Sequence, residues 1–348
     1  MVTDGPASNS PAPHKRRPRY AGKNPRRFED KYKERDPQRH PDTVEKVIAS
    51  GKTPAGTHRP IMVAEILEVL APSPGKLAVD CTLGYGGHAV EILKRIQPGG
   101  RLIGLDADPL ELPKTEARLR ALGFDPGAFH AHRSNFAGLP RILAVHDLAG
   151  ADLILADLGV SSMQIDDPSR GFSVKHEGPP DMRLNPERGE PASALLKKLK
   201  PHALAELLTD NADEPRAAEL AVALAERSFA TTIALAQAIR DASPRLKKDD
   251  ANLTVRRVFQ ALRIAVNDEF SALDTLLRML PGCLAPAGRV AILTFHSGED
   301  RRVKKSFEAG LRDGLYSEIS REVIRPSAEE QRSNSRSSPA KLRWAGKK

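Results

Sequence analysis

Aromatic residues, cysteines and long apolar runs are all scarce in this chain of 348 residues. Phe, Trp and Tyr make up 4% of it, which argues against rows of aromatic platforms that stack single-stranded bases. The two cysteines, Cys81 and Cys283, lie far apart in apolar surroundings, which argues against a disulfide framework or a zinc site. No apolar run is long enough to cross a membrane, and the first residues lack the apolar core of a signal peptide. We therefore expect a cytoplasmic protein with no membrane partner.

Positive charge, by contrast, is plentiful. Lys and Arg number 54 against 45 Asp and Glu, a formal net charge of +9, so an acidic polymer is a reasonable partner. Much of the excess lies in residues 1–56, which are rich in Pro, Ala and Ser and then in Lys and Arg. Such a segment buries too little apolar surface to fold, and we expect a basic, disordered extension. It is either an arm that binds RNA phosphates or a solubilising tail.

The segment Leu77–His88 organises the rest of the chain. It reads as a short apolar strand that ends at Asp80, then a glycine-rich turn, then a helix that starts near Ala89. This arrangement presents backbone N–H groups and a helix N-terminus to a nucleotide-like ligand. The glycines do not follow the regular dinucleotide pattern, which favours a mononucleoside cofactor such as S-adenosylmethionine.

Strands and helices alternate up to residue 157, which predicts an α/β fold with a parallel sheet. The expected elements are strands at 77–80, 102–106, 128–131 and 152–157 and helices at 61–70, 89–96 and 109–122. Residues 166–188 then show no period. Helical patterns follow at 192–208, 215–227, 231–241 and 254–280.

The fifth strand is expected only at 289–295, too far along the chain for an ordinary strand connection. We therefore predict an all-helical domain, residues 166–265, inserted into a sheet domain formed by residues 57–165 and 266–348. A basic helix at 299–312 and an antiparallel hairpin of 316–324 with 340–345 complete the sheet domain.

Two acids at strand ends are candidates for binding and catalysis. Asp106 follows Asp80 at about the spacing expected for a carboxylate that binds a cofactor ribose, although a helix-capping acid has the same pattern. Asp157 ends the fourth strand, where a carboxylate can accept a hydrogen bond from an amino group. Gln164, after the turn at Gly159, can bind a base edge, and His88 can contact the cofactor. A capped strand end with ordinary turn residues is the alternative for Asp157 and Gln164, and a structural histidine at a helix start is the alternative for His88.

Polar residues after the fifth strand have two interpretations. Asp300 and Arg301 are either a substrate clamp or the acidic start of a helix. Basic residues on two predicted helices either contact phosphates or form a solvated face; they are Arg256, Arg257, Arg263, Lys304 and Lys305. His130 and His132 share a strand face without an acidic or cysteine partner, so no metal is expected.

Taken together, these motifs resemble the RsmH/MraW methyltransferases over most of the chain from about His58. The carriers of the resemblance are Asp80–His88, Asp106–Pro109, Asp157–Gln164, Arg170–Ser173, Gly178–Arg183, Phe259–Asn267 and Phe295–Ser297. The resemblance implies a class I S-adenosylmethionine-dependent methyltransferase sheet, Rossmann-like, with an inserted helical domain that recognises the substrate. It also implies S-adenosylmethionine-dependent methylation of N4 of a cytidine in the decoding region of 16S ribosomal RNA.

The resemblance carries site residues with it. Asp157 is the expected catalytic residue, and the expected cofactor-binding residues are Gly86, Gly87, His88, Asp106, Phe136, Asp157 and Gln164. The chain departs from the family pattern at Leu83, Tyr85, Asn211–Pro215 and Gly298.

Several alternatives stay open at this point. The chain could methylate an amino group on another polymer, or be a non-catalytic ribosome-assembly factor that binds RNA. Small-subunit ribosomal RNA is the expected partner, either free or in an assembled small subunit. A homodimer is compatible with the sequence.

Overall fold

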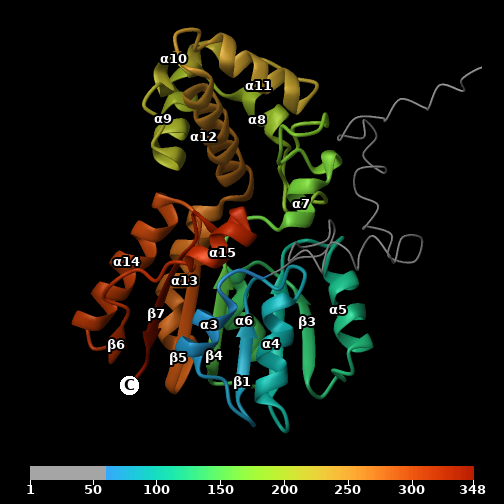
Figure 1. Ribbon diagram of the computed structural model, residues 1–348, viewed down its shortest axis with the longest axis vertical. Helices are drawn as coiled ribbons and strands as arrows, with labels where there is room; N and C mark the ends of the chain where they lie inside the picture. The colour runs from blue at the N-terminus through green and yellow to red at the C-terminus, as the bar shows by residue number, and fades with distance from the viewer. Residues whose placement is uncertain (1–59) are drawn as a thin grey trace, which may run out of the picture.

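The structure is a computed structural model that describes residues 60–348. Figure 1 shows a sheet domain below and a bundle of helices above it. The predicted basic extension, residues 1–56, lies outside the described residues.

A seven-stranded sheet forms the lower part of the molecule, in the order β3-β2-β1-β4-β5-β7-β6. Its strands are β1 Leu77–Asp80, β2 Arg101–Asp106, β3 Phe129–Arg133, β4 Ala151–Asp157, β5 Leu284–Thr294, β6 Glu318–Ile319 and β7 Lys341–Gly346. Strands β1 to β5 are parallel, whereas β7 runs antiparallel to both β5 and β6. The five predicted parallel strands and the edge hairpin are confirmed.

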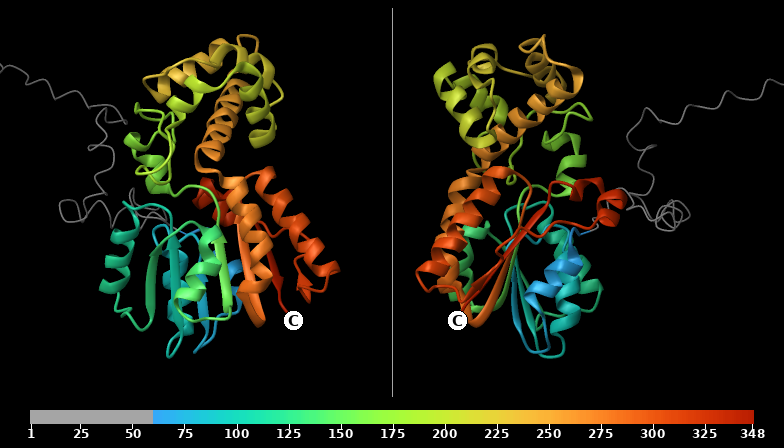
Figure 2. Two further views of the ribbon diagram at one scale, coloured as in Figure 1. Left: turned by 180° about the vertical axis from the view of Figure 1, so that it is seen from behind. Right: turned by 60° about the vertical axis from the view of Figure 1, so that its left-hand side comes forward.

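Helices cover both faces of this sheet, as the right-hand view of Figure 2 shows. One layer contains α3 Val63–Leu70, α4 Gly87–Ile96 and α5 Leu112–Ala121; the other contains α6 Leu139–Val145, α13 Glu269–Cys283 and α14 Ser297–Arg312. Each layer has its own apolar core against the sheet. Because the strands are buried on both faces, their sequences read as nearly continuous apolar runs.

The inserted helices form a third, separate core. They are α8 Ala192–Lys198, α9 Pro201–Ala212, α10 Ala217–Leu224, α11 Thr232–Asp241 and α12 Lys248–Asn267, and we call them the helical unit. Figure 1 places this unit beyond the carboxyl ends of the strands, with α12 running down toward the sheet. The carboxyl ends of the strands therefore face a second body of protein, which is where ligands bind in open α/β sheets.

Two of the helix predictions are wrong, because each predicted single helix is two helices in the structure. The pattern at 254–280 is two helices, because Asp268 adopts a left-handed conformation with φ of 50° between α12 and α13. The pattern at 192–208 is also two helices, since Leu199 and Lys200 are extended before Pro201 begins α9. A residue before proline avoids the helical region, which explains this second break. Helix α6 lacks a sequence prediction altogether.

The connection between β6 and β7 crosses the carboxyl edge of the sheet. It contains α15 Ala328–Ser333 and a short 3-10 helix, Ser335–Ser337. Glu330 Oε1 accepts a hydrogen bond from the backbone N–H of Met62 at 2.9 Å. Figure 1 shows α15 above the strands, between the sheet and the helical unit.

Within residues 60–348, none of the helices combines the length and the apolar character that crossing a membrane requires.

Candidate active site

A cavity of about 480 Å³ lies at the carboxyl ends of β1, β2 and β4. Its wall combines the glycine turn after β1, the turn after β4, part of α12 and the connection after α15. All seven residues predicted to bind the cofactor line it, namely Gly86, Gly87, His88, Asp106, Phe136, Asp157 and Gln164. The structure thus brings the predicted residues together in one place.

The glycine turn is held against the second strand. The backbone N–H of Gly84 donates to Asp106 Oδ2 at 2.7 Å, and Thr115 Oγ1 donates to the Gly84 carbonyl at 2.5 Å. Gly86 has a φ of 77°, and a Cβ there would lie 2.8 Å from a methyl of Leu119. Only glycine fits this position, because the turn packs closely against α5 there.

Asp106 ends β2 with hydrogen-bonding capacity to spare. Its Oδ1 accepts from the backbone N–H of Asp108 at 2.8 Å, and its Oδ2 accepts from Gly84. A carboxylate oxygen takes two hydrogen bonds, so each oxygen has one acceptor position left. Burial raises the pKa of Asp106 to about 6, so the group is mostly ionised at neutral pH. Such a group suits two neighbouring ribose hydroxyls.

Asp157 ends β4 beneath the cavity. Its backbone N–H donates to Thr82 Oγ1 at 2.6 Å, which fixes the strand end against the turn after β1. Its Oδ1 is buried and has no hydrogen-bond partner among residues 60–348. Burial raises the pKa of Asp157 to about 7, and the charge of Glu299 adds to the shift. Asp157 therefore lines the cavity with a carboxyl group that has one unpartnered oxygen among residues 60–348 and titrates near neutral pH.

His88 lies beside Asp157 but does not hydrogen-bond to it. His88 Nε2 lies 2.9 Å from the carbonyl of Ile61, which can only accept, so Nε2 carries the hydrogen. The other nitrogen, Nδ1, lies 3.7 Å from Asp157 Oδ2. Burial lowers the pKa of His88, so the ring is neutral at physiological pH and holds the start of α4 to the chain before α3.

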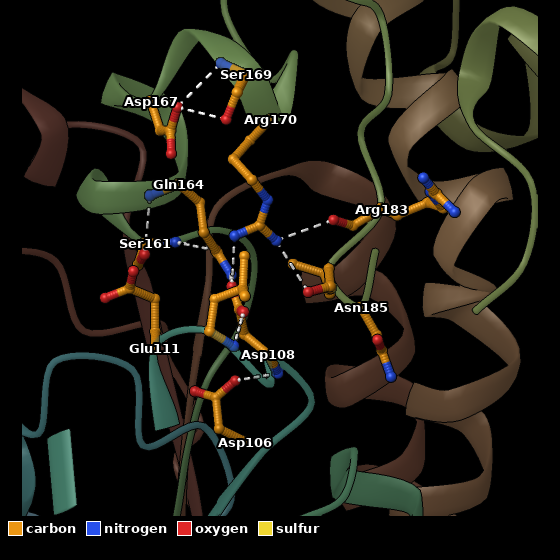
Figure 3. A network of polar contacts seen from close by, with 12 residues as sticks. Asp106, Asp108, Glu111, Ser161, Gln164, Asp167, Ser169, Arg170, Arg183 and Asn185 are labelled. Atoms are coloured by element: carbon orange, nitrogen blue, oxygen red, sulfur yellow. Dashed lines mark hydrogen bonds and ion pairs between the residues drawn. The ribbon is translucent and has the colours of Figure 1, made fainter. Parts of the chain in front are cut away.

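Gln164 has a structural role in the turn after β4, which agrees with its interpretation as an ordinary residue of a capped turn. Its Oε1 accepts from the backbone N–H of Ser161 at 2.9 Å while Ser161 caps the same short helix, α7 Ser162–Asp166. Its Nε2 donates to Asp108 Oδ2 at 2.8 Å (Figure 3). The side chain still has one amide hydrogen for a ligand, but its orientation is set by the protein.

Phe136 follows β3 and is half-buried. It packs against the core beneath the sheet and also lines the cavity. Its ring offers the flat apolar surface that a purine prefers, so the two readings of this residue, core and cofactor contact, are compatible.

Glu111 is a cavity residue that the sequence reasoning missed. Its Oε1 accepts from Lys114 Nζ at 2.9 Å, whereas its Oε2 is buried without a partner among residues 60–348. Glu111 lines the same cavity as Asp106 and stands just before α5 (Figure 3). The only sequence signal is an acid before a helix, which is ordinary capping chemistry.

Arg170, in one of the family motifs, joins the sheet to the loop before the helical unit. Its Nη1 donates to Asp108 Oδ2 at 2.7 Å, and its Nη2 donates to the carbonyls of Arg183 and Leu184 at 3.0 and 2.9 Å (Figure 3). Asn267, at the end of α12, accepts from the Leu184 N–H at 2.7 Å. These motif residues therefore shape the cavity indirectly, by fixing the loop that closes one side of it.

The residues after β5 act elsewhere. Asp300 accepts from Lys341 and Arg343 of β7 at 3.0 and 2.6 Å, and Arg301 pairs with Asp213 at 3.2 Å. Neither Asp300 nor Arg301 lines the cavity. The structure therefore fits the interpretation as the acidic start of a helix, α14, rather than a substrate clamp.

The histidines of β3 lie away from the cavity. His132 Nε2 is 2.7 Å from His146 Nε2, and His130 also packs on the His146 ring. Among residues 60–348, no group of three or more His, Cys, Asp or Glu side chains is arranged to hold a metal ion.

The cavity fits a nucleoside-bearing methyl donor. Two acids, Asp106 and Glu111, have unused acceptors for hydroxyl groups, Phe136 offers an apolar ring, and the glycine turn permits close backbone approach. Together with five parallel strands and an antiparallel β7 in this order, the cavity defines a class I methyltransferase, whose methyl donor is S-adenosylmethionine.

The particular family follows from sequence comparison. Residues 55–348 match the model of the MraW methylase family, and the chain belongs to that family. Ribosomal RNA small subunit methyltransferase H 1 of Lachnoclostridium phytofermentans is 48% identical over 99% of this chain and 96% of its own length. Ribosomal RNA small subunit methyltransferase H 2 of Alkaliphilus metalliredigens is 49% identical over 95% of this chain and 97% of its own.

A solved structure, TrmN from Thermus thermophilus, aligns at 14% identity with a TM-score of 0.40, over 82% of this chain and 48% of its own. The family assignment rests on the sequence matches alone.

Proposed function

We propose that this chain transfers a methyl group from S-adenosylmethionine to N4 of a cytidine in the decoding region of 16S ribosomal RNA, in the cytoplasm. The observation that carries the proposal is the carboxyl group of Asp157, which lines the cavity and whose buried Oδ1 has no partner among residues 60–348. An amino group is the natural donor for that oxygen. The names of the two relatives support small-subunit ribosomal RNA as the substrate.

Asp157 acts on the attacking amine. In its ionised form, Oδ1 accepts a hydrogen bond from one N–H of the cytosine amino group and aligns the nitrogen lone pair. Bound S-adenosylmethionine supplies an activated methyl group on a positively charged sulfur. As the amine becomes N-methylated, it loses one proton, and Asp157 Oδ1 is placed to take it. The hydrogen bond from the Asp157 backbone N–H to Thr82 Oγ1 fixes the strand end from which the carboxyl group extends.

Other cavity residues hold the methyl donor. Gly86 and Gly87 allow it to approach the backbone, Asp106 and Glu111 accept from its ribose hydroxyls, and Phe136 contacts its base. His88 and Gln164 keep these elements in register, because their polar atoms are largely bound within the protein.

The helical unit belongs to substrate recognition in this proposal. A base inside RNA must leave its stack to reach Asp157, so the substrate is a single-stranded or deformable element. Residues 166–265 would receive that element beside the sheet domain, formed by residues 57–165 and 266–348. The core of the helical unit is separate from the cores of the sheet, which supports this division.

The decisive experiment is mapping of the product. The full-length protein is incubated with labelled S-adenosylmethionine and either free 16S ribosomal RNA or small subunits, and the nucleosides are identified by mass spectrometry. N4-methylcytidine in the decoding region is expected, and the comparison shows which substrate form is preferred. Label on DNA, protein or another nucleoside would refute the proposal in favour of a different amino-methyltransferase.

No observation favours a non-catalytic assembly factor. Such a protein has no need for an ionisable carboxyl group with an unpartnered oxygen in a cavity of this kind. Calorimetric failure to bind S-adenosylmethionine would be required to revive that alternative.

A further inference from the structure

Three arginines line the cavity from elements outside the parallel strands: Arg256 and Arg263 from α12 and Arg336 from the connection after α15. Two of them are neutralised within the protein. Arg263 donates to both oxygens of Glu269 at 2.9 and 2.8 Å, and Arg336 Nη2 lies 2.8 and 3.0 Å from the oxygens of Asp166. Arg263 and Arg336 are therefore each paired with an acidic side chain of the protein.

Arg256 differs from the other two. Its side chain is exposed and makes no ion pair or hydrogen bond with any residue from 60 to 348. Its neighbours Val255 and Val258 are buried and attach α12 to the core of the helical unit. The guanidinium group of Arg256 is therefore free to bind an anion without any loss of packing.

The position of Arg256 suits a contact outside the reacting centre. Arg263 lies near the turn after β4, since a Cβ on Gly159 would be 4.0 Å from Arg263 Nη1. Arg256 is two helical turns earlier on the same face of α12, or ~10 Å along the helix axis. Asp157, Arg263 and Arg256 line the same cavity, so an RNA strand whose base lies at Asp157 can continue along α12 toward Arg256.

We propose that Arg256 binds a backbone phosphate of the RNA strand whose base enters the cavity, an inference that rests on the proposed function. A guanidinium group forms two parallel hydrogen bonds with a phosphate, which sets orientation as well as affinity. The carboxylate of the methyl donor is the other anion available. Phosphate is favoured because Arg256 belongs to the helical unit and is exposed, whereas the glycine turn approaches the donor from the sheet.

The test compares Arg256→Ala, Arg256→Lys and a control, Arg245→Ala, in the full-length protein. Arg245 is also an exposed arginine of the same region, but it does not line the cavity. Affinity for unmethylated small subunits is measured at several salt concentrations with S-adenosylhomocysteine present, so that no turnover is needed. Affinity for S-adenosylmethionine is measured separately by calorimetry.

Arg256→Ala should weaken subunit binding about tenfold, the loss of one charge-assisted contact, and reduce the logarithmic salt slope by about 0.7. Arg256→Lys should retain the salt slope but recover only part of the affinity. Arg245→Ala should bind like the wild type, and S-adenosylmethionine affinity should stay within about twofold in all variants.

Equal losses in Arg256→Ala and Arg245→Ala would overturn the inference, because they would show a general charge effect. A loss of S-adenosylmethionine affinity in Arg256→Ala would overturn it in favour of the donor carboxylate. If the wild type binds small subunits but makes no N4-methylcytidine, the proposed function fails while the phosphate contact can still be judged from binding.

Discussion

Asp157 lines the cavity and keeps one carboxyl oxygen buried without a partner among the described residues. Buried polar groups are almost always paired, and an exception in a cavity indicates a ligand. The same burial brings the pKa of Asp157 to about 7, within the range where its ionisation matters for activity.

Methyl transfer should rise with pH through the pKa of Asp157. The pKa is raised above its ordinary value of 3.8 to about 7. The ionised carboxylate is therefore lost as the pH falls below 7, and Asp157 is fully ionised only well above pH 7. Single-turnover rates on both sides of pH 7, at saturating S-adenosylmethionine, provide the measurement. Circular dichroism at each pH controls for unfolding. A flat profile would contradict a role for the ionised carboxylate.

Glu111 should contribute to donor binding. Glu111→Ala removes the second unpartnered acceptor of the cavity, and we expect S-adenosylmethionine affinity to fall about tenfold by calorimetry. Lys114→Ala is the matched control, since it removes the exposed partner of Glu111 but leaves the cavity acceptor in place. Unchanged affinity in Glu111→Ala would show that the oxygen does not face the donor.

At the scale of elements, the link through Arg170 and Asp108 holds the loop before α8 to the sheet. Both side chains are buried, and Arg170 also satisfies two carbonyls of that loop. Removing one partner of a buried ion pair leaves an uncompensated charge, which costs about 3–5 kcal/mol. Arg170→Ala should therefore lower the free energy of unfolding by about that amount in chemical denaturation.

Arg183→Ala is the comparison for this prediction. The Arg183–Asp181 pair is more exposed, so its loss should cost about 1 kcal/mol or less. Equal costs for the two variants would mean that Arg170 is not an anchor.

The elements that sequence reasoning identified share a simple physical cause. Buried parallel strands such as β2 and β4 have apolar central residues and end in Asp106 and Asp157, so the pattern predicts both the strand and the acid at its end. The break at Asp268 has no such signal, because aspartate occurs both inside helices and, as here with φ of 50°, in the left-handed conformation. The Pro201 break was readable in principle, since proline disfavours helix in the residue before it.

The site residues also divide into those with a local sequence signal and those without one. Asp106 and Asp157 are predictable because strand ends meet at one edge of a sheet. Glu111 and the Arg170–Asp108 pair are not, because their roles depend on contacts between distant segments. Gln164 illustrates why a sequence pattern alone does not decide a role. The same pattern suits ligand binding and a capping box, and the structure contains the capping box.

On the scale of the whole molecule, the cavity is lined by residues of the sheet domain and of the helical unit, which have separate apolar cores. The sheet supplies the acids and the glycine turn, while α12 of the helical unit supplies Arg256 and Arg263. In the proposed function, the wall formed by the sheet domain binds the donor and the wall formed by α12 binds the RNA. Variants on one wall should leave the function of the other nearly intact.

The basic N-terminal segment gives a separate prediction. If residues 1–56 bind RNA phosphates, a protein that starts near Thr57 should show weaker methyl transfer to small subunits and a smaller salt dependence. S-adenosylmethionine affinity of both forms is the control, and it should not change. Equal transfer and equal salt dependence would mean that the segment is not an RNA-binding arm.

The most direct test concerns Asp157 itself. Asp157→Asn and Asp157→Ala are compared with the wild type for S-adenosylmethionine affinity by calorimetry and for N4-methylcytidine formation on small subunits. Both variants should bind S-adenosylmethionine within a modest factor of the wild type and make essentially no product, because neither retains the ionised carboxylate that takes the proton of the amine. Undiminished turnover in either variant would contradict the proposed role of the Asp157 carboxylate.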